Sequence, residues 1–225
     1  MKGKIIVIEG TDCSGKETQS VMLEKKLNNM GIKCMRFEFP NYTSPTGKIV
    51  GGAYLGKSEI CESYFKEGAT NLDPHIACLY YAADRKYNIK EIEKYLNLGY
   101  ICILDRYTTS NMAHQGGKIE KQEERFQFFK KIETLEFDIL NLPKPDLVIL
   151  LYVPFQVTID LQHKRCASPD QNEKDKKHLK RAEQTYLELR ALYHFKMVEC
   201  TKDNQMRGIE AIHDEVLSLV KEALN

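Results

Sequence analysis

Five short apolar runs along the chain predict β-strands, at residues 5–8, 33–39, 101–104, 147–152 and 197–200. The first run, Ile5-Ile6-Val7-Ile8, is β-branched and would be apolar on both faces of a strand. Such a strand is typical of the interior of a parallel sheet, which is covered by helices on both sides.

Between these runs, apolar residues recur at helical spacing. Residues 15–30, 74–98 and 121–140 have this pattern, and Gly31 and Gly99 are placed to end the first two helices. Two further sets repeat in the same way: Leu179, Ala182, Tyr186, Leu189 and Tyr193, then Ile209, Ile212, Val216, Leu219 and Ala223. Alternating strands and helices predict an α/β fold, a five-stranded parallel sheet flanked by helices on both faces. No repeat or flexible linker interrupts it, so we expect a single domain, 1–225.

Composition narrows the class of protein. Hydrophobic residues make up 42% and charged residues 29% of the 225 positions, and the net charge is +1. This balance fits a globular protein and gives no basic field for nucleic acid. No apolar run approaches the length of a membrane span, and the seven cysteines show no CxxC spacing. We therefore expect a cytoplasmic protein with reduced cysteines and with neither nucleic acid nor membrane as a partner.

The strongest chemical signal lies between the first strand and the first helix. It reads Gly10-Thr11-Asp12-Cys13-Ser14-Gly15-Lys16-Glu17-Thr18, with the spacing G-x4-G-K of a phosphate-binding P-loop. Glycines let successive backbone N–H groups point inward, and the helix N-terminus and Lys16 add positive charge. The motif in this context predicts the P-loop NTPase fold, with ATP bound along these nine residues.

One position of the motif departs from the usual pattern. Glu17 stands where Ser or Thr ordinarily ligates magnesium, and Thr18 would point about 100° away on the helix. We expect Mg²⁺ to be held by water together with Asp12 or Asp105.

The third strand runs directly into Asp105-Arg106-Tyr107, beside the predicted phosphate loop. A carboxylate there can orient a hydrated metal or an acceptor oxygen, and an arginine can neutralise transferred charge. No segment for guanine recognition is present, which disfavours a GTPase. Residues 162–181 are rich in cations interleaved with acids, which indicates either a solvated charged segment or a lid that closes over phosphates.

Together with the P-loop, several blocks in order make the sequence resemble the thymidylate kinase family over nearly its whole length. They are Phe39-Pro40-Asn41-Tyr42, Pro45-Thr46-Gly47-Lys48, Tyr81-Ala82-Ala83-Asp84-Arg85, Asp105-Arg106-Tyr107 through Ser110-Asn111, Leu142-Pro143-Lys144-Pro145-Asp146 and Asp170-Gln171-Asn172-Glu173. The resemblance implies transfer of the γ-phosphoryl group of ATP to dTMP, giving dTDP and ADP, with Mg²⁺. It also implies a homodimer, for which residues 74–98 and 121–140 could supply apolar faces.

The resemblance assigns roles to individual residues. It implies catalytic roles for Asp12, Lys16, Asp105 and Arg106, and metal binding by Asp12 and Asp105. Tyr81 matches an aromatic that stacks on thymine, Arg85 and Asn111 match residues at the base edge, and Arg106 matches the holder of the 5′-phosphate. An ion pair with Asp84 is the structural alternative for Arg85. The implied acceptor pocket comprises Phe39, Pro40, Tyr81, Arg85, Arg106, Ser110, Asn111, His114, Gln115 and Glu173.

Three departures from the family concern charge and sugar selection. Tyr42 stands where many members carry an arginine, and Cys13 occupies a position where some place a catalytic arginine. We expect the compensating cation from the lid, where Lys164, Arg165 and Lys174 are the candidates and Arg165 would join the ATP site. His114 replaces a tyrosine near the sugar 2′ position, where it could exclude a hydroxyl or accept one.

Two other functions remain open from the sequence. A deoxynucleoside kinase shares the P-loop and sheet, but it needs a general base for the 5′-hydroxyl, and Asp105-Arg106 is the nearest candidate pair. A non-catalytic nucleotide-binding module would follow if Glu17 weakened the metal site. Turnover of thymidine faster than dTMP would indicate the first, and ATP binding without ADP formation the second.

Overall fold

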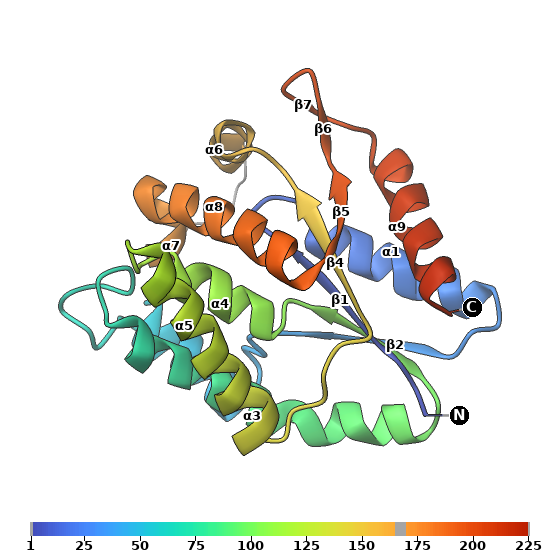
Figure 1. The fold of residues 1–225 in the computed structure, drawn as a ribbon, viewed down its shortest axis with the longest axis horizontal. Coiled ribbons are helices and arrows are strands. Elements are labelled where there is room, and N and C mark those ends of the chain that lie inside the picture. The colour runs from blue at the N-terminus through green and yellow to red at the C-terminus, as the bar shows by residue number, and fades with distance from the viewer. Residues whose placement is uncertain (1, 165–169, 225) are drawn as a thin grey trace.

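The computed structural model describes residues 2–164 and 170–224 (Figure 1). Five strands form one parallel sheet in the order β2-β3-β1-β4-β5. They are β1 (Ile5–Gly10), β2 (Cys34–Glu38), β3 (Ile101–Asp105), β4 (Leu147–Tyr152) and β5 (Lys196–Glu199). The five-stranded parallel sheet predicted from the apolar runs is confirmed.

Helices cover both faces of the sheet, as predicted. On one face, α1 (Lys16–Asn29), α6 (Phe155–Lys164) and α9 (Ile209–Leu224) pack around Ile6 and Ile8. The opposite face carries α3 (Pro74–Asn97), which packs around Ile5 and Val7. The helices α4 (Thr108–Gly116), α5 (Gln122–Glu133) and α8 (Lys176–Tyr193) extend this second layer (Figure 1). Successive residues of β1 therefore serve opposite cores, because side chains alternate along a strand.

Helix ends follow local chemistry. Gly15, with φ +83°, precedes α1, and Gly31, with φ +77°, follows it, both in a conformation that favours glycine. The first turn of α3 begins with Pro74, and the Asp73 carboxylate accepts a hydrogen bond from the backbone N–H of His75. The predicted boundaries of these two helices hold to within one residue.

Several elements were not predicted. The chain forms α2 (Pro45–Lys48), a π-helical turn η1 (Ile49–Tyr54), α4, α6 and α7 (Gln171–Lys174). The predicted helix 121–140 is α5 followed by a second π-helical turn, η2 (Thr134–Ile139). Every residue of α4 is buried, many of them polar, so its sequence lacks the apolar period of a surface helix. Thr201-Lys202-Asp203 belongs to a small hairpin of β6 (Thr201–Lys202) and β7 (Gln205–Met206).

The sheet order determines where chemistry can occur. β2, β3 and β1 are parallel neighbours, so their carboxyl ends share one edge. The loops leaving that edge carry residues 10–15, 39–42 and 106–107, which contain much of the predicted phosphate loop together with Phe39, Pro40 and Arg106. Across the described residues, no helix combines the length and hydrophobicity needed to cross a membrane.

Candidate active site

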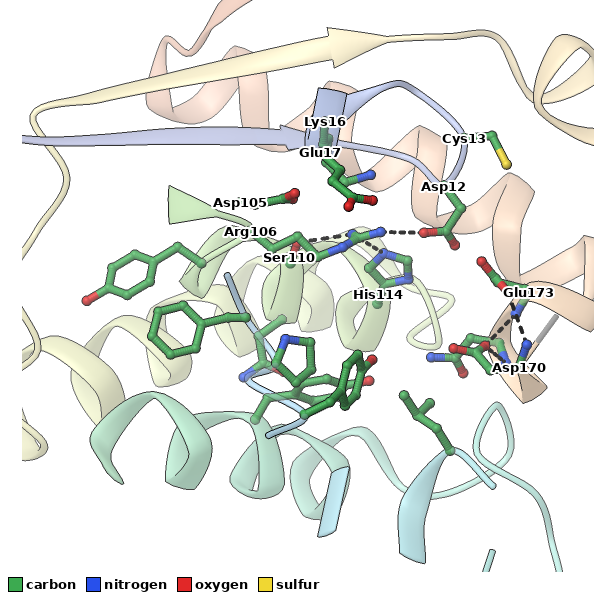
Figure 2. Close-up of a pocket in the computed structure, with 18 of the residues that line it drawn as sticks. Asp12, Cys13, Lys16, Glu17, Asp105, Arg106, Ser110, His114, Asp170 and Glu173 are labelled. Atoms are coloured by element: carbon green, nitrogen blue, oxygen red, sulfur yellow. Dashed lines mark hydrogen bonds and ion pairs between the residues drawn. The ribbon is translucent and has the colours of Figure 1, made fainter. Parts of the chain in front are cut away.

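A cavity of about 730 Å³ lies at the carboxyl edge of the sheet (Figure 2). It brings together most of the predicted site residues: Asp12, Cys13, Gly15, Lys16, Glu17, Thr18, Phe39, Pro40, Tyr81, Arg85, Asp105, Arg106, Ser110, Asn111, His114 and Glu173. Gly10, Thr11 and Ser14 are buried within the phosphate loop and do not line the cavity. Gln115 is fully buried in α4 and also stands outside the lining, so its role in substrate binding stays a prediction. Arg165 lies outside the described residues.

The phosphate loop depends on a glycine at its first position. Gly10 has φ +153°, and a Cβ there would lie 2.5 Å from the Leu151 carbonyl oxygen and 2.6 Å from Ser14 Oγ. No side chain fits at those distances, so the loop can turn back against β4 only with glycine. Lys16 Nζ donates to the Thr11 carbonyl oxygen at 2.7 Å. This bond holds the ammonium within the loop, while Lys16 still faces the cavity.

Burial and the nearby Arg106 cation lower the pKa of Lys16 to about 8. A lysine in this environment gains charge stabilisation when an anion arrives, because the phosphate replaces the lost water. The loop therefore presents a cation that is incompletely compensated until a phosphate binds.

Arg106 is the centre of the charge network. It follows β3 with φ +66°, a left-handed conformation that turns its side chain toward the phosphate loop. The guanidinium pairs with the Asp12 carboxylate and donates to Ser110 Oγ at 3.3 Å (Figure 2). Burial alone would raise the pKa of Asp12, but the charges of Arg106 and Lys16 outweigh it and hold that pKa below its usual value.

A buried carboxylate that the sequence analysis missed anchors this turn. Glu9 accepts hydrogen bonds from the backbone N–H groups of Tyr107 and Ser110, each at 3.0 Å. It also accepts from Ser110 Oγ at 2.6 Å and from the Tyr186 hydroxyl at 3.0 Å. Burial raises the pKa of Glu9, and these donors counteract part of that rise. The sequence carries one indication of this role, because Glu9 is a lone carboxylate directly after the apolar run 5–8.

Asp105 also has a partner that the sequence did not indicate. Arg36 of β2 donates to Asp105 Oδ2 at 3.1 Å and to Ser20 Oγ at 2.7 Å. Asp105 thus lines the cavity in a fixed orientation, paired with a cation from the neighbouring strand.

The far end of the cavity is aromatic and holds a second arginine. Phe39, Pro40 and Tyr81 line it. Arg85 forms a double ion pair with Glu136 of η2, at 2.5 and 2.6 Å, so the alternative of an ion pair with Asp84 is wrong. No sequence pattern indicated Glu136, because it lies 51 residues from Arg85 in a turn that projects it inward.

The two ends of the Asn111 side-chain amide differ in their hydrogen bonding. Its Nδ2 donates to the Cys78 carbonyl oxygen at 3.1 Å and to Glu136 Oε1 at 3.0 Å. Its buried Oδ1 has no hydrogen-bond partner among the described residues. Asn111 therefore offers an acceptor, and a ligand that satisfies it must carry a donor.

Two histidines stack beside Arg106. His114 Nε2 lies 3.4 Å from Arg106 Nη1, and its Nδ1 lies 3.2 Å from His178 Nε2. Because a guanidinium only donates, this geometry places the His114 proton on Nδ1. Burial lowers the pKa of His178 to about 4 and that of His114 well below its usual value, so both rings are neutral near pH 7. His178 was not predicted as part of this region.

The predicted lid carries acids toward the cavity. Asp170 caps α7, with its carboxylate accepting from the backbone N–H groups of Asn172 and Glu173. Asp170 and Glu173 both line the cavity, whereas Lys174 is exposed to solvent. Arg181 pairs with Glu120 at 2.8 Å on the surface. Of the other lid candidates, Arg165 and the side chain of Lys164 lie outside the described part.

Comparisons with known proteins agree with this geometry. The family model for thymidylate kinase matches residues 8–216. The chain is 32% identical to the thymidylate kinase of Brachyspira hyodysenteriae over 225 residues, covering 99% of this chain and 96% of that one. It is 27% identical to human thymidylate kinase, with 99% and 92% covered.

The fold is likewise similar to a solved thymidylate kinase, that of Candida albicans. The TM-score is 0.73 at 25% identity, with 98% of this chain and 92% of that chain covered. A phosphate loop facing a half-buried arginine at the end of the neighbouring strand is thus accompanied by likeness over the whole length, and the chain belongs to the thymidylate kinase family.

Proposed function

We propose that Lys16 and Arg106 hold the two reacting phosphates, with ATP along the phosphate loop and the acceptor phosphate at Arg106. As a thymidylate kinase, the protein phosphorylates dTMP with ATP as donor, in the synthesis of dTDP. The observation that carries the residue assignment is that Lys16 and Arg106 line one cavity together with Asp12, the carboxylate that is paired with Arg106. An arriving phosphate can take over that carboxylate's role as counterion.

Phosphoryl transfer here needs positioning more than covalent chemistry. An oxygen of the dTMP phosphate attacks the γ-phosphorus of ATP, the bond from that phosphorus to the β-γ bridging oxygen breaks, and ADP leaves with the electron pair. The acceptor phosphate is largely a dianion near pH 7, so no strong general base is required. Lys16 and Arg106 compensate the charge on the donor and acceptor sides and keep them in line.

Mg²⁺ would be held by Asp12 and Asp105, and it would neutralise charge on the β- and γ-phosphates. Both carboxylates face the cavity, and carboxylate oxygen is a ligand that suits this hard cation. Within residues 2–164 and 170–224, no cluster of three or more His, Cys, Asp or Glu side chains could hold a metal by itself. The remaining ligands would therefore be water and phosphate oxygens, as is common for Mg²⁺.

The aromatic end of the cavity suits a pyrimidine base. Tyr81 and Phe39 provide flat apolar faces, and Asn111 Oδ1 provides the acceptor that the N3–H group of thymine would satisfy. Arg85 stays paired with Glu136, and the guanidinium N–H groups that Glu136 does not bind would donate to a carbonyl oxygen of the base. Neutral His114, between this end and Arg106, would face the sugar. Residues 162–181 are proposed to act as a lid.

A second copy of the chain would cover the outer face of α3. Ile76, Leu79 and Tyr87 share one stripe of this helix and are 46%, 52% and 57% exposed. Such a stripe is typical of an isologous dimer interface. Light scattering should give a molar mass twice that of the chain, and Leu79→Lys should reduce the measured mass to that of a single chain.

Cys34, Cys78, Cys102 and Cys200 are buried free thiols, which supports a reducing, cytoplasmic location.

The substrate assignment is tested by coupled detection of ADP. The enzyme should turn over dTMP faster than dUMP, dCMP or dGMP, and thymidine should be a poor acceptor because it lacks the phosphate that Arg106 binds. Lack of turnover with every pyrimidine monophosphate would overturn the assignment. Faster use of thymidine than dTMP would instead indicate a nucleoside kinase.

A further inference from the structure

The cavity contains a lysine that no motif identified. Lys57 follows η1 and lines the wall that also holds Tyr42. Its Nζ lies 4.8 Å from the centroid of the Tyr42 ring and 4.0 Å from Asp170 Oδ2. The first contact is a cation–π interaction, and the second is at the outer limit of an ion pair. The ammonium is thus placed in the cavity without a close anionic partner.

The other cations of the cavity are held more tightly. Arg85 has its double ion pair with Glu136, and Arg106 is paired with Asp12. Lys16 donates to a loop carbonyl at 2.7 Å. Among the described residues that line the cavity, Lys57 is therefore the cation with the weakest attachment, and the one most readily moved by an incoming anion.

Tyr42 fixes where that cation sits. A Cβ on Gly51 would lie 2.8 Å from Tyr42 Cδ1, so the ring is seated directly against the η1 backbone. Tyr42 lines the same cavity as Arg106 and Asp12. Its contact with Lys57 therefore places this lysine in the cavity that also contains the Arg106–Asp12 pair, where the acceptor phosphate is proposed to bind.

The charge balance at that point calls for another cation. Arg106 and Asp12 together are neutral, yet a monophosphate near pH 7 brings about −1.5 to −2 charges. Tyr42 contributes none, although an arginine there would. A lysine, with its flexible stem and compact charge, can supply the difference from a neighbouring element.

We propose that Lys57 moves away from Asp170 to bind the phosphate of the acceptor nucleotide, and thereby supplies positive charge beyond that of the Arg106–Asp12 pair. This inference rests on the proposed placement of the acceptor at Arg106. The competing explanation is that Lys57 only tethers α7, which is also held by Gln171 Oε1 accepting from the Ala69 N–H at 2.6 Å. The two explanations predict different ligand dependence.

Calorimetric titration with dTMP and with thymidine separates them, because only dTMP carries the phosphate. Lys57→Met should weaken dTMP binding roughly 10- to 100-fold, the range for a lost charged hydrogen bond, and change thymidine binding less than about twofold. Lys57→Arg should restore most of the dTMP affinity. In steady-state kinetics the Lys57→Met defect should fall on KM for dTMP rather than on KM for ATP.

Asp170→Asn is the matched control, because it removes the tether and keeps the lysine. It should leave dTMP binding unchanged or tighter. If Asp170→Asn loses as much as Lys57→Met, or if Lys57→Met weakens both ligands equally or neither, the proposal is wrong. Wild-type protein that binds thymidine as tightly as dTMP would overturn the acceptor placement itself, independently of Lys57.

Discussion

Two arginine–carboxylate pairs stand in the same cavity and differ in what surrounds them. The side chains of Arg85 and Glu136 are 2% and 0% exposed, whereas those of Arg106 and Asp12 are 20% and 12% exposed. Glu136 also accepts from Thr108 Oγ1 at 2.9 Å, so its oxygens are fully occupied. We call these the closed pair and the open pair.

The open pair has a different kind of support. Apart from Asp12, the partners of the Arg106 side chain lie at 3.3–3.5 Å, which is long for a hydrogen bond. A ligand phosphate can take the place of such partners at little cost. The closed pair is thus part of the architecture of the site, whereas the open pair has the exchangeable partners that the proposed phosphate-binding role of Arg106 requires.

The largest expected effect is on the closed pair. Glu136→Gln leaves the Arg85 charge buried without its counterion, which should lower the free energy of unfolding by about 3–5 kcal/mol. Urea denaturation followed by circular dichroism measures it. Glu124→Gln is the control, since Glu124 pairs with Lys121 on the surface and should change stability by less than about 1 kcal/mol. Equal effects of the two substitutions would show that the closed pair contributes no more to stability than a surface pair does.

A substitution in the open pair should lower enzymatic activity more than it lowers the free energy of unfolding. Arg106→Ala should remove about 2–5 kcal/mol of transition-state stabilisation, a fall in kcat/KM for dTMP of roughly 30- to 4,000-fold. Urea denaturation should show a smaller loss for this variant than for Glu136→Gln. Arg207→Ala, which breaks a surface pair with Glu215, should keep wild-type kcat/KM. An Arg106→Ala enzyme with unaltered kcat/KM would show that Arg106 does not hold the acceptor.

A smaller effect should appear with pH. Lys16, beside the open pair, has its pKa lowered to about 8, by burial first and by Arg106 second. As pH rises through 8 the free enzyme loses this cation, so kcat/KM for ATP should fall about tenfold per pH unit above it. The Lys16 contribution to stability runs the other way. Between pH 8 and the ordinary lysine value of 10.5 the unfolded chain binds more protons, so the free energy of unfolding gains from this group as pH rises.

The profile of the Arg106→Ala variant sharpens this test. Removing the neighbouring charge should raise the Lys16 pKa and move the alkaline limb to higher pH. If kcat/KM for ATP falls at the same pH in the variant as in the wild type, the titrating group is not Lys16.

The sheet and the phosphate loop could be predicted because their signals are local. A β-branched run such as residues 5–8 and the spacing from Gly10 to Lys16 need no knowledge of distant residues. The partners of the site residues could not be predicted, since Arg85 meets Glu136 and Asp105 meets Arg36 only after folding. Gln115 was predicted in the cavity by its proximity to His114, but helical geometry turns neighbouring residues to different faces.

The position of Glu9 has a mechanical consequence. Glu9 and Gly10 are adjacent at the end of β1. Glu9 accepts the hydrogen bonds that anchor the turn after Arg106, and Gly10 is the first residue of the phosphate loop. In the proposed placement of the two nucleotides, the separation between donor and acceptor is therefore set at the end of one interior strand.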